Sequence, residues 1–430
     1  MEKTQKPINL DTDVNVHLES KKISRHFFVF LWLMYTAVYM TKSSFNGALA
    51  SIVSEGILTK SQTGFITAMF YAVYAPLQII GGMIADKRSP ELLVKIGLIG
   101  AAISNTIIFF NQSYPVMLGA WIFNGMIQFG IWPGIFKIIS AQLVRSDRKM
   151  MSYYISFPGT IGLMLSYIIA AVVPHWSFSF LISAVLLLFF AVGLHLYEKH
   201  LTPYMKWDRF ENVKAENLNM PTAYGTKGIF LKSGFFFVVV AVLFSMTVNQ
   251  SKRSLASIMF VETYDSVSPS LGNILTVVLL ISGLVGTIIA GKLVKYIKNP
   301  LLSSAIIFTV LLPVLFLCTY VGNISITFMV VLLCITIILE SIESLIRTNY
   351  TMTFAKYGKS ATAAGILNAA MSLSFMLAAY VIPLLVESFG WRVVIFIWLG
   401  MMMLTVTLLL IASSKHKRFE QKQAVNKTQE

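Results

Sequence analysis

Long apolar runs separated by short polar breaks constrain this chain more than any other feature of its sequence. Each run is close to the length of roughly 20 residues that an α-helix needs to cross the hydrocarbon layer of a membrane. Hydrophobic residues make up 56% of the chain and charged residues only 12%, whereas an average soluble domain has about 25% charged residues. A water-soluble core cannot bury so much apolar surface, so the sequence predicts helices that are surrounded by lipid.

Twelve spans are predicted, six on each side of a polar segment. They lie near residues 26–50, 60–85, 91–111, 114–144, 150–174, 177–197, 233–258, 268–292, 301–321, 325–350, 360–386 and 391–413. The expected domains are a cytoplasmic N-terminal tail (1–25), a first six-helix bundle (26–197), a cytoplasmic central linker (198–232), a second six-helix bundle (233–413) and a basic cytoplasmic tail (414–430). The predicted fold class is an all-α polytopic membrane protein with two pseudo-symmetric six-helix bundles.

The basic residues indicate how the chain is oriented. If both termini are cytoplasmic, most of the 34 Lys and Arg residues fall in the two tails, the central linker and the other cytoplasmic connections. Cytoplasmic loops carry such an excess in multi-pass proteins of the cell membrane. The same residues are spread over short loops instead of gathering on one soluble face, which argues against a nucleic-acid partner.

A few charged residues fall inside the predicted spans, where they cost about 2.5 to 3.5 kcal/mol each and normally face a cavity or a partner. They are Lys42, Lys137, Lys252, Arg253, Glu340, Glu343 and Arg347. These residues are the strongest functional candidates that the sequence offers.

Lys42 and Lys252 stand at comparable depths in the first span of each half. Two ammonium groups that face each other across the bundle interface would attract an anion such as a phosphate or a carboxylate. The alternative is that each lysine reaches an interface or pairs with a buried carboxylate. Arg253 must point elsewhere than its neighbour, and either of the two could face the cavity.

Three further residues are candidates for substrate binding. Lys137 follows a Trp132-Pro133-Gly134 sequence that can kink the fourth span and open space, although a packing kink beside a lysine that reaches the interface explains it equally well. Tyr39 and Tyr74 could line a polar path for a hydroxylated solute, although aromatic residues in spans are more often packing or interfacial residues.

The tenth span carries an acidic pair followed by a base. Glu340, Glu343 and Arg347 share one helical face, and Glu343 can pair with Arg347. Such carboxylates could accept a coupling proton, and a structural ion pair is the other interpretation.

No catalytic constellation, metal cluster or cofactor motif is found, so an enzyme, a catalytic residue, a bound metal and a cofactor are not expected. A channel is not expected either, because neither a filter nor rings of charge are visible.

The string GGMIADKR, Gly81–Arg88, resembles the signature loop of the major facilitator superfamily, with Gly82, Asp86, Lys87 and Arg88 at the motif positions. Further strings are YTAVYMTKSSF from Tyr35, IQFGIWPGIFK from Ile127, and the segment from Ala361 to Trp391. Together they are similar to the organophosphate:inorganic phosphate antiporters, which carry glycerol phosphate and hexose phosphates. This resemblance implies the major facilitator fold and two halves that expose a central site alternately.

The resemblance also implies a phosphate-binding arginine in the first and seventh spans, where this chain has Lys42 and Lys252. Lys137 likewise stands where the family has a basic residue. An ammonium keeps the attraction but loses the bidentate geometry of a guanidinium, so a carboxylate substrate stays open beside a phosphate ester.

The predicted function is therefore secondary active transport of a small organic anion, with inorganic phosphate or protons as a counter-ion or co-ion and the lipid bilayer as surroundings. The alternative is a proton-coupled exporter of drugs or metabolites that uses Glu340 or Glu343. A monomer is expected.

Overall fold

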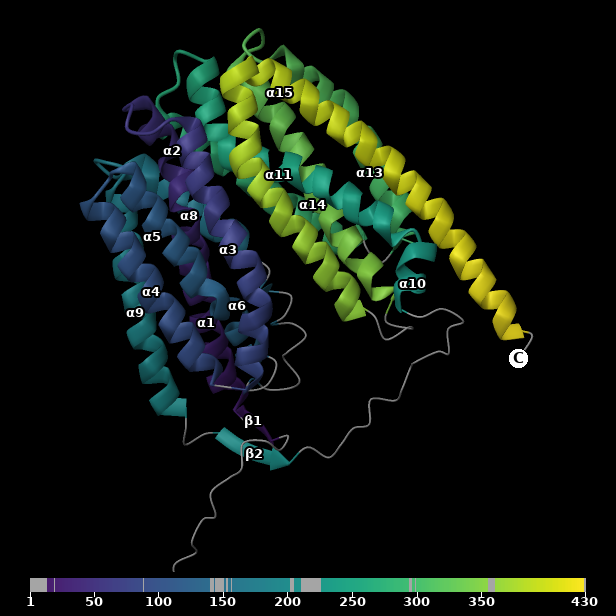
Figure 1. Ribbon diagram of the computed structural model, residues 1–430, viewed down its shortest axis with the longest axis horizontal. Coiled ribbons are helices and arrows are strands. Elements are labelled where there is room, and N and C mark those ends of the chain that lie inside the picture. Colours follow the sequence, from purple (N-terminus) through teal and green to yellow (C-terminus); the bar gives the residue numbers. More distant parts are fainter. Residues whose placement is uncertain are drawn as a thin grey trace, which may run out of the picture.

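The computed structural model describes residues 14–18, 20–87, 89–139, 143, 151, 154–155, 157–201, 205–209, 226–293, 296–297, 299–354 and 360–428. The helices form two bundles that lie side by side, the first from the N-terminal half and the second from the C-terminal half (Figure 1). Throughout, "linker side" means the end of the molecule at which α9 ends and β2 and α10 lie, and "far side" means the opposite end.

The first bundle contains the helices up to α9. They are α1 (Lys21–Lys42), α2 (Ser44–Ser54), α3 (Lys60–Lys87), α4 (Pro90–Phe110), α5 (Tyr114–Ile127), the 3₁₀ turn η1 (Gln128–Gly130), α6 (Ile131–Lys137), α8 (Pro158–Val172) and α9 (Phe178–Leu201). Two of the predicted spans are interrupted, the first at Ser43 between α1 and α2 and the fourth at η1.

The second bundle follows the linker. It comprises α10 (Thr226–Lys232), α11 (Phe235–Thr263), α12 (Pro269–Leu293), α13 (Pro300–Leu317), the 3₁₀ turn η5 (Cys318–Tyr320), α14 (Ile326–Met352) and α15 (Ser360–Thr428). Helix α15 holds two spans, because Gly390 has a positive φ of 76° and turns the chain on the far side. Only glycine adopts this conformation readily, since it has no Cβ.

Each predicted span coincides with a helix or a pair of helices, and the all-α membrane fold is confirmed. Among the described residues, eight helical segments are long and apolar enough to cross a membrane, with α1–α2 counted as one and α15 as one. The other predicted spans correspond to α3, to α5–α6 and to the shorter α8. Two short strands, β1 (Val14–Leu18) and β2 (Met205–Arg209), pair antiparallel and join the tail to the linker. The domain boundaries proposed from the sequence stay predictions.

The irregular points of the helices follow from local chemistry. Ser43 and Ser44 interrupt the first span directly after Lys42, where Thr41 donates its hydroxyl proton to the carbonyl of Val38. Hydroxyl side chains of this kind compete with the helical hydrogen bonds of the backbone. At the other interruption, Pro133 lacks the N–H that would bond to the preceding turn, and the chain forms η1 there.

The signature segment differs from its predicted form. Residues Gly82, Asp86 and Lys87 continue helix α3 instead of forming a loop, and the helix ends before Ser89 and Pro90, the residues that begin α4. Ser89 accepts a hydrogen bond from the backbone N–H of Leu92 and so begins α4. The side chains of Asp86 and Lys87, and all of Arg88, lie outside the described residues.

The two bundles are in close contact on the far side. A Cβ at Gly64 of α3 would collide with the carbonyl oxygen of Ala379 of α15. Phe65 packs edge-on against Tyr380, with ring centroids 5.3 Å apart. Only glycine permits such an approach of two helix backbones. In Figure 1 the same two helices are further apart toward the linker side.

Candidate functional site

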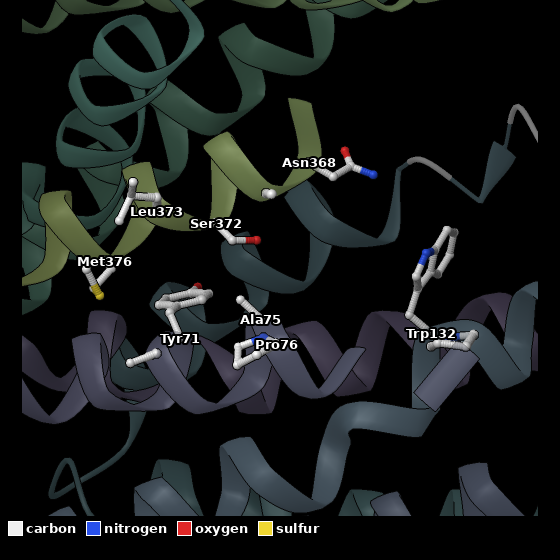
Figure 2. Close-up of a pocket in the computed structure, with 11 residues that line it drawn as sticks. Tyr71, Ala75, Pro76, Trp132, Asn368, Ser372, Leu373 and Met376 are labelled. Carbon is white, nitrogen blue, oxygen red and sulfur yellow. The ribbon is translucent and has the colours of Figure 1, made fainter. Parts of the chain in front are cut away.

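A cavity of about 450 Å³ lies between the bundles, on the linker side of the Gly64 contact. Figure 2 shows side chains of α15 opposite side chains of α3 and α6. The lining residues are Tyr71, Ala72, Ala75, Pro76, Trp132, Pro133, Asn368, Ala369, Ser372, Leu373 and Met376. The lining is mostly small and apolar with a few polar groups, which is the usual character of a site for a small molecule.

Lys42 extends its ammonium into a cluster of four aromatic rings. The Nζ atom lies 3.5 Å from the ring centroid of Tyr74, 5.2 Å from that of Phe70, and 5.7 Å from those of Tyr39 and Tyr71. Within the described part of the chain, no carboxylate lies within ion-pair distance of this ammonium. The rings attract the cation through their negative faces, but they do not neutralise it.

Aromatic contacts connect this cluster to the cavity. Tyr71 belongs to the ring cluster and also lines the cavity. Tyr39 accepts a hydrogen bond of 3.4 Å from the hydroxyl of Tyr35, whose ring stacks on Trp132 at 5.1 Å. Since Trp132 is a second lining residue, the predicted residues Lys42, Tyr39 and Tyr74 lie beside the cavity.

Lys252 is held differently. Its Nζ lies 2.6 Å from Oε1 of Glu340 on α14 and donates to the Thr336 hydroxyl at 3.0 Å. The Lys252 side chain is 0% exposed and that of Glu340 is 1% exposed. Lys252 therefore does not act as a second free cation opposite Lys42 in this conformation. It follows the alternative interpretation of the sequence, in which a buried carboxylate, here one of its own bundle, neutralises it.

Arg253 points away from Lys252, as neighbours on a helix must. Its Nη2 donates to the hydroxyl of Ser341 at 3.1 Å, and its Nη2 also lies close to Gly283 of α12. The backbone here is part of the bundle interface, because the Tyr167 hydroxyl of α8 contacts the carbonyl oxygens of Arg253 and Ser254 at 2.9 and 3.0 Å. Both basic side chains of this pair therefore face the interior of the second bundle.

Other predicted site residues are placed only in part. Lys137 ends α6 and Arg347 lies within α14, but the side chains of both lie outside the described residues. The Glu343 side chain is buried. The predicted ion pair between Glu343 and Arg347 therefore stays a prediction.

Charged residues fasten the bundles on the far side. Lys60 at the start of α3 lies 2.8 Å from Glu262 near the end of α11, and Trp391 donates its indole N–H to the same carboxylate at 2.8 Å. The side chains of Lys60 and Glu262 are 18% and 26% exposed. This ion pair therefore joins the two bundles at the far end of the interface, where both side chains are partly exposed to solvent.

Glu387 of α15 makes a second contact of this kind. Its carboxylate accepts the backbone N–H of Ser61 at 2.9 Å and also the Ser61 hydroxyl. Thr59 and Gln62 bond each other's backbone N–H as a capping box, which identifies this point as the N-terminus of α3. A carboxylate is favourable there because the first N–H groups of a helix have no partner within the helix.

Sequence reasoning missed several of these residues. Asn368, Ser372 and the α15 side of the cavity gave no signal, because neutral residues of a span look alike whether they face lipid or a cavity. The pairing of Lys252 with Glu340 could have been found from their opposite charges at similar depths in two spans. Among the described residues, no cluster of three or more His, Cys, Asp or Glu side chains could hold a metal ion.

Known proteins with similar sequences include a membrane sensor protein and hexose phosphate transport proteins. The Membrane sensor protein UhpC of Salmonella typhimurium is 27% identical over 173 residues, 40% of this chain and 39% of that protein. A probable hexose phosphate transport protein of Chlamydia trachomatis is 27% identical over 121 residues, 28% of this chain and 26% of that protein. The chain thus matches less than half the length of these curated relatives. They confirm the resemblance to the organophosphate:phosphate antiporters.

Solved structures agree on the fold. A bacterial homologue of the human lysosomal transporter Spinster, in an inward-facing and unoccupied conformation, superposes with a TM-score of 0.76 at 14% identity, over 93% of this chain and 98% of that one. A D-xylose–proton symporter gives a TM-score of 0.66 at 13% identity, over 91% and 97%. At such identities the likeness shows the fold alone.

The family profile covers far more of the chain than the individual relatives do. It matches residues 31–362 and again residues 253–429, and so includes both bundles, the cavity between them and the ring cluster around Lys42. This multi-pass membrane protein belongs to the Major Facilitator Superfamily.

Proposed function

We propose that this chain is a secondary carrier that binds a small organic anion, a phosphate ester or a carboxylate, beside Lys42 and exposes it alternately to the two sides of the membrane. The observation that carries the proposal is the Lys42 ammonium, which lies beside the inter-bundle cavity behind the ring of Tyr71 and contacts rings instead of a carboxylate. An uncompensated cation in a cavity of low dielectric constant attracts an anion strongly.

Two further observations support an organic anion. The matched relatives include a probable hexose phosphate transport protein. The cavity offers the flat rings of Tyr71 and Trp132 together with the polar side chains of Asn368 and Ser372. Rings and hydrogen-bonding groups of this kind suit the body of a hydroxylated molecule such as a sugar.

The distribution of basic residues and the contacts on the far side favour one orientation and one conformation. The excess of basic residues favours a cytoplasmic location for both termini and the linker. The contacts at Lys60, Ser61 and Gly64 then close the outer face, and the chain adopts an inward-facing conformation.

The test is uptake into proteoliposomes that contain the purified full chain. Labelled glucose 6-phosphate, glycerol 3-phosphate and glucuronate are exchanged against the same unlabelled anion inside. Replacing Lys42 by Gln removes a charged hydrogen bond of about 1.5 to 3 kcal/mol, so we expect exchange to fall about 10- to 100-fold.

Lys42→Arg should keep most of the exchange, because it keeps the charge. The matched control is Lys95→Gln, which removes a lysine that pairs with Glu198 at 2.6 Å within the first bundle. Exchange by Lys42→Gln within twofold of that of the control would refute the assignment of the site.

A second candidate function is sensing, because two matched relatives are membrane sensor proteins. A sensor would bind one of these anions without moving it. Binding measured by thermal shift in detergent, together with no exchange above empty liposomes, would favour sensing over transport.

The exporter alternative has less support. Glu340, one of its two acidic candidates, is already neutralised by Lys252, which leaves that carboxylate no free charge for a cationic drug.

A further inference from the structure

We propose that an anionic phospholipid of the linker-side leaflet binds in an apolar groove between Trp32 of α1 and Ile288 of α12, here called the seam groove. An acyl chain lies against Trp32, and the phosphate lies against basic residues at the linker-side ends of α1 and α12. The inference goes beyond the proposed function, because it uses neither Lys42 nor the central cavity. The seam groove has a volume of about 530 Å³, within the range of about 300 to 1,000 Å³ that ligand sites have.

Both bundles contribute walls to the seam groove. From the first bundle come Phe28, Val29 and Trp32 of α1, together with Ile161 in the first turn of α8. From the second bundle comes Ile288 of α12. Every lining side chain is aliphatic or aromatic, so hydrocarbon fills the groove more favourably than water does.

The seam groove lies where α8 and α12 separate. Toward the far side, Leu163 and Tyr167 of α8 pack against Leu280 of α12 in one buried cluster. Ile288 lies about two helical turns further along α12, toward the linker side, and its side chain is 52% exposed. Val29, across the groove, is 53% exposed. Exposed apolar side chains that gather within membrane spans mark a surface for lipid.

The ring of Trp32 is fixed in the wall of the groove. Its indole N–H donates to the carbonyl oxygen of Tyr154 at 3.0 Å, so the one polar atom of the side chain is already satisfied. The ring therefore presents an apolar surface to the groove. A wall that is ordered before the ligand arrives lowers the entropy cost of binding.

The seam groove has the depth of one leaflet. Trp32 lies eleven residues after Lys21, the first residue of α1, or about 16 Å along the helix axis at 1.5 Å per residue. Half of the hydrocarbon core of a bilayer is about 15 Å thick. An acyl chain of the linker-side leaflet therefore reaches the whole length of the groove.

The linker-side end of the groove is basic. Lys22 and Arg25 precede Val29 by seven and four residues, so both lie on the same face of α1 as Val29. Lys292 follows Ile288 by four residues on α12, and all three basic residues are exposed. The sequences of α1, α8 and α12 contain no Asp or Glu, so no acidic residue of these helices repels a phosphate. Basic pockets between membrane helices bind anionic lipid head groups.

The position of these bases distinguishes them from others at the same end of the molecule. Basic residues also occur in the last turns of α9 and α10, so their number alone identifies no site. Lys22, Arg25 and Lys292 continue the walls of the groove, two from one bundle and one from the other. A phosphate between them therefore has cations on two sides.

A lipid in this position stabilises one conformation of the carrier. The bundles are in contact on the far side, and a rocking movement that opens the far side closes the linker side. That movement brings α12 toward α1 and α8 and narrows the seam groove. A bound acyl chain therefore opposes the movement and favours the conformation in which the far side is closed.

The experiment measures contact between Trp32 and a lipid with brominated acyl chains, because bromine quenches tryptophan fluorescence at short range. Brominated phosphatidylglycerol is titrated into the purified full chain in detergent. The chain has seven Trp residues, so the signal of Trp32 is the difference between wild type and Trp32→Phe. We expect saturable quenching that unbrominated phosphatidylglycerol reverses, and at least about tenfold weaker binding of brominated phosphatidylcholine. Equal binding of the two lipids would refute an anionic head-group site.

Charge variants test the head-group site. Lys22→Gln/Arg25→Gln/Lys292→Gln removes three cations that each strengthen binding about fivefold, so we expect the affinity for phosphatidylglycerol to fall about 100-fold.

The matched control is Lys232→Gln/Lys417→Gln/Arg418→Gln. It also removes two lysines and one arginine, and these residues are exposed but lie on α10 and α15. The affinity of this control should stay close to that of wild type. Equal weakening in the two triple variants would contradict the site.

A larger side chain tests the groove itself. Ile288→Phe fills space opposite Trp32 and should abolish most of the quenching of Trp32. The control is Ile274→Phe, the same change nearer the far side of α12 at a side chain that is 51% exposed. This control should keep the quenching, and equal quenching in both variants would rule out an acyl chain in the groove.

Native mass spectrometry of the full chain covers the case in which Trp32→Phe fails to fold. Wild type and the Lys232 triple variant should retain a bound phosphatidylglycerol, and the Lys22 triple variant should lose it. Retention by all three proteins would overturn the inference. Neither measurement requires transport, so a failure of this inference leaves the proposed function intact, and a failure of the proposed function leaves this inference intact.

Discussion

The carboxylate of Glu387 offers the sharpest test of how the bundles are held together. It lies on α15 but accepts the backbone N–H of Ser61 at the N-terminus of α3, in the other bundle. Replacing Glu387 by Gln removes its charge from this helix end while keeping the size of the side chain. The closed far side should lose stability relative to the conformation that is open there.

The expected magnitude follows from the exposure of the group. A side chain that caps a helix contributes about 0.5 to 2 kcal/mol, and a charge at a helix end about 0.3 to 1 kcal/mol. Glu387 is exposed, so solvent screens the interaction and the lower part of these ranges applies. We expect a loss of about 1 kcal/mol, which raises the population of the far-side-open conformation about fivefold.

The assay measures access to the cavity from the far side. A cysteine in place of Ser372, which lines the cavity, is alkylated by a membrane-impermeant maleimide in a variant with Cys318 and Cys334 replaced by Ser. The rate of labelling should rise about fivefold in Glu387→Gln.

The matched control is Glu55→Gln. Glu55 is also a far-side carboxylate, but it accepts the indole N–H of Trp176 within the first bundle and so does not join the two bundles. Equal labelling rates in Glu387→Gln and Glu55→Gln would refute the view that Glu387 holds the far side closed.

Three further substitutions test the packing of the bundles. Gly64→Ala makes a Cβ collide with the backbone oxygen of Ala379 of α15 and should open the far side, with faster labelling than in Glu387→Gln. Asn273→Ala removes the hydrogen bond to the carbonyl of Gly47 and the acceptor of the Ser257 hydroxyl, and at about 0.5 to 1.5 kcal/mol for each buried hydrogen bond the melting temperature should fall by several degrees. Gly390→Ala forces a side chain into a positive φ at a cost of about 1 to 2 kcal/mol and should also lower the melting temperature. Gly400→Ala, in a helix with open space around it, should not lower the melting temperature. Equal melting temperatures of Gly390→Ala and Gly400→Ala would contradict the role of the positive φ.

The sequence was sufficient to predict the spans, because each helix must present some 20 apolar residues to lipid regardless of its neighbours. It also identified Lys42, since a charge within a span is costly wherever it lies. Both predictions depend on the local sequence and on the membrane, which is why they could be made from one chain.

Contacts between distant segments could not be predicted in the same way. The sequence groups Glu340 with Glu343 and Arg347 on one helical face, because spacing along a helix is the one geometry that a sequence gives directly. Its partner Lys252 lies on another helix, and the pairing depends on how α11 and α14 pack. The capping of α3 by Glu387 likewise depends on the placement of one bundle against the other.

The ring of Tyr71 adjoins three parts of the carrier, namely the Lys42 ammonium, the cavity and helix α15. Its ring lies 5.7 Å from the Lys42 ammonium, lines the cavity, and packs edge-on against Phe375 of α15 at 5.6 Å. A solute that displaces this ring to reach Lys42 must at the same moment disturb the contact with α15. Occupancy of the cavity and separation of the two halves would then be mechanically linked through one side chain, with no need for a signal to travel along a longer route.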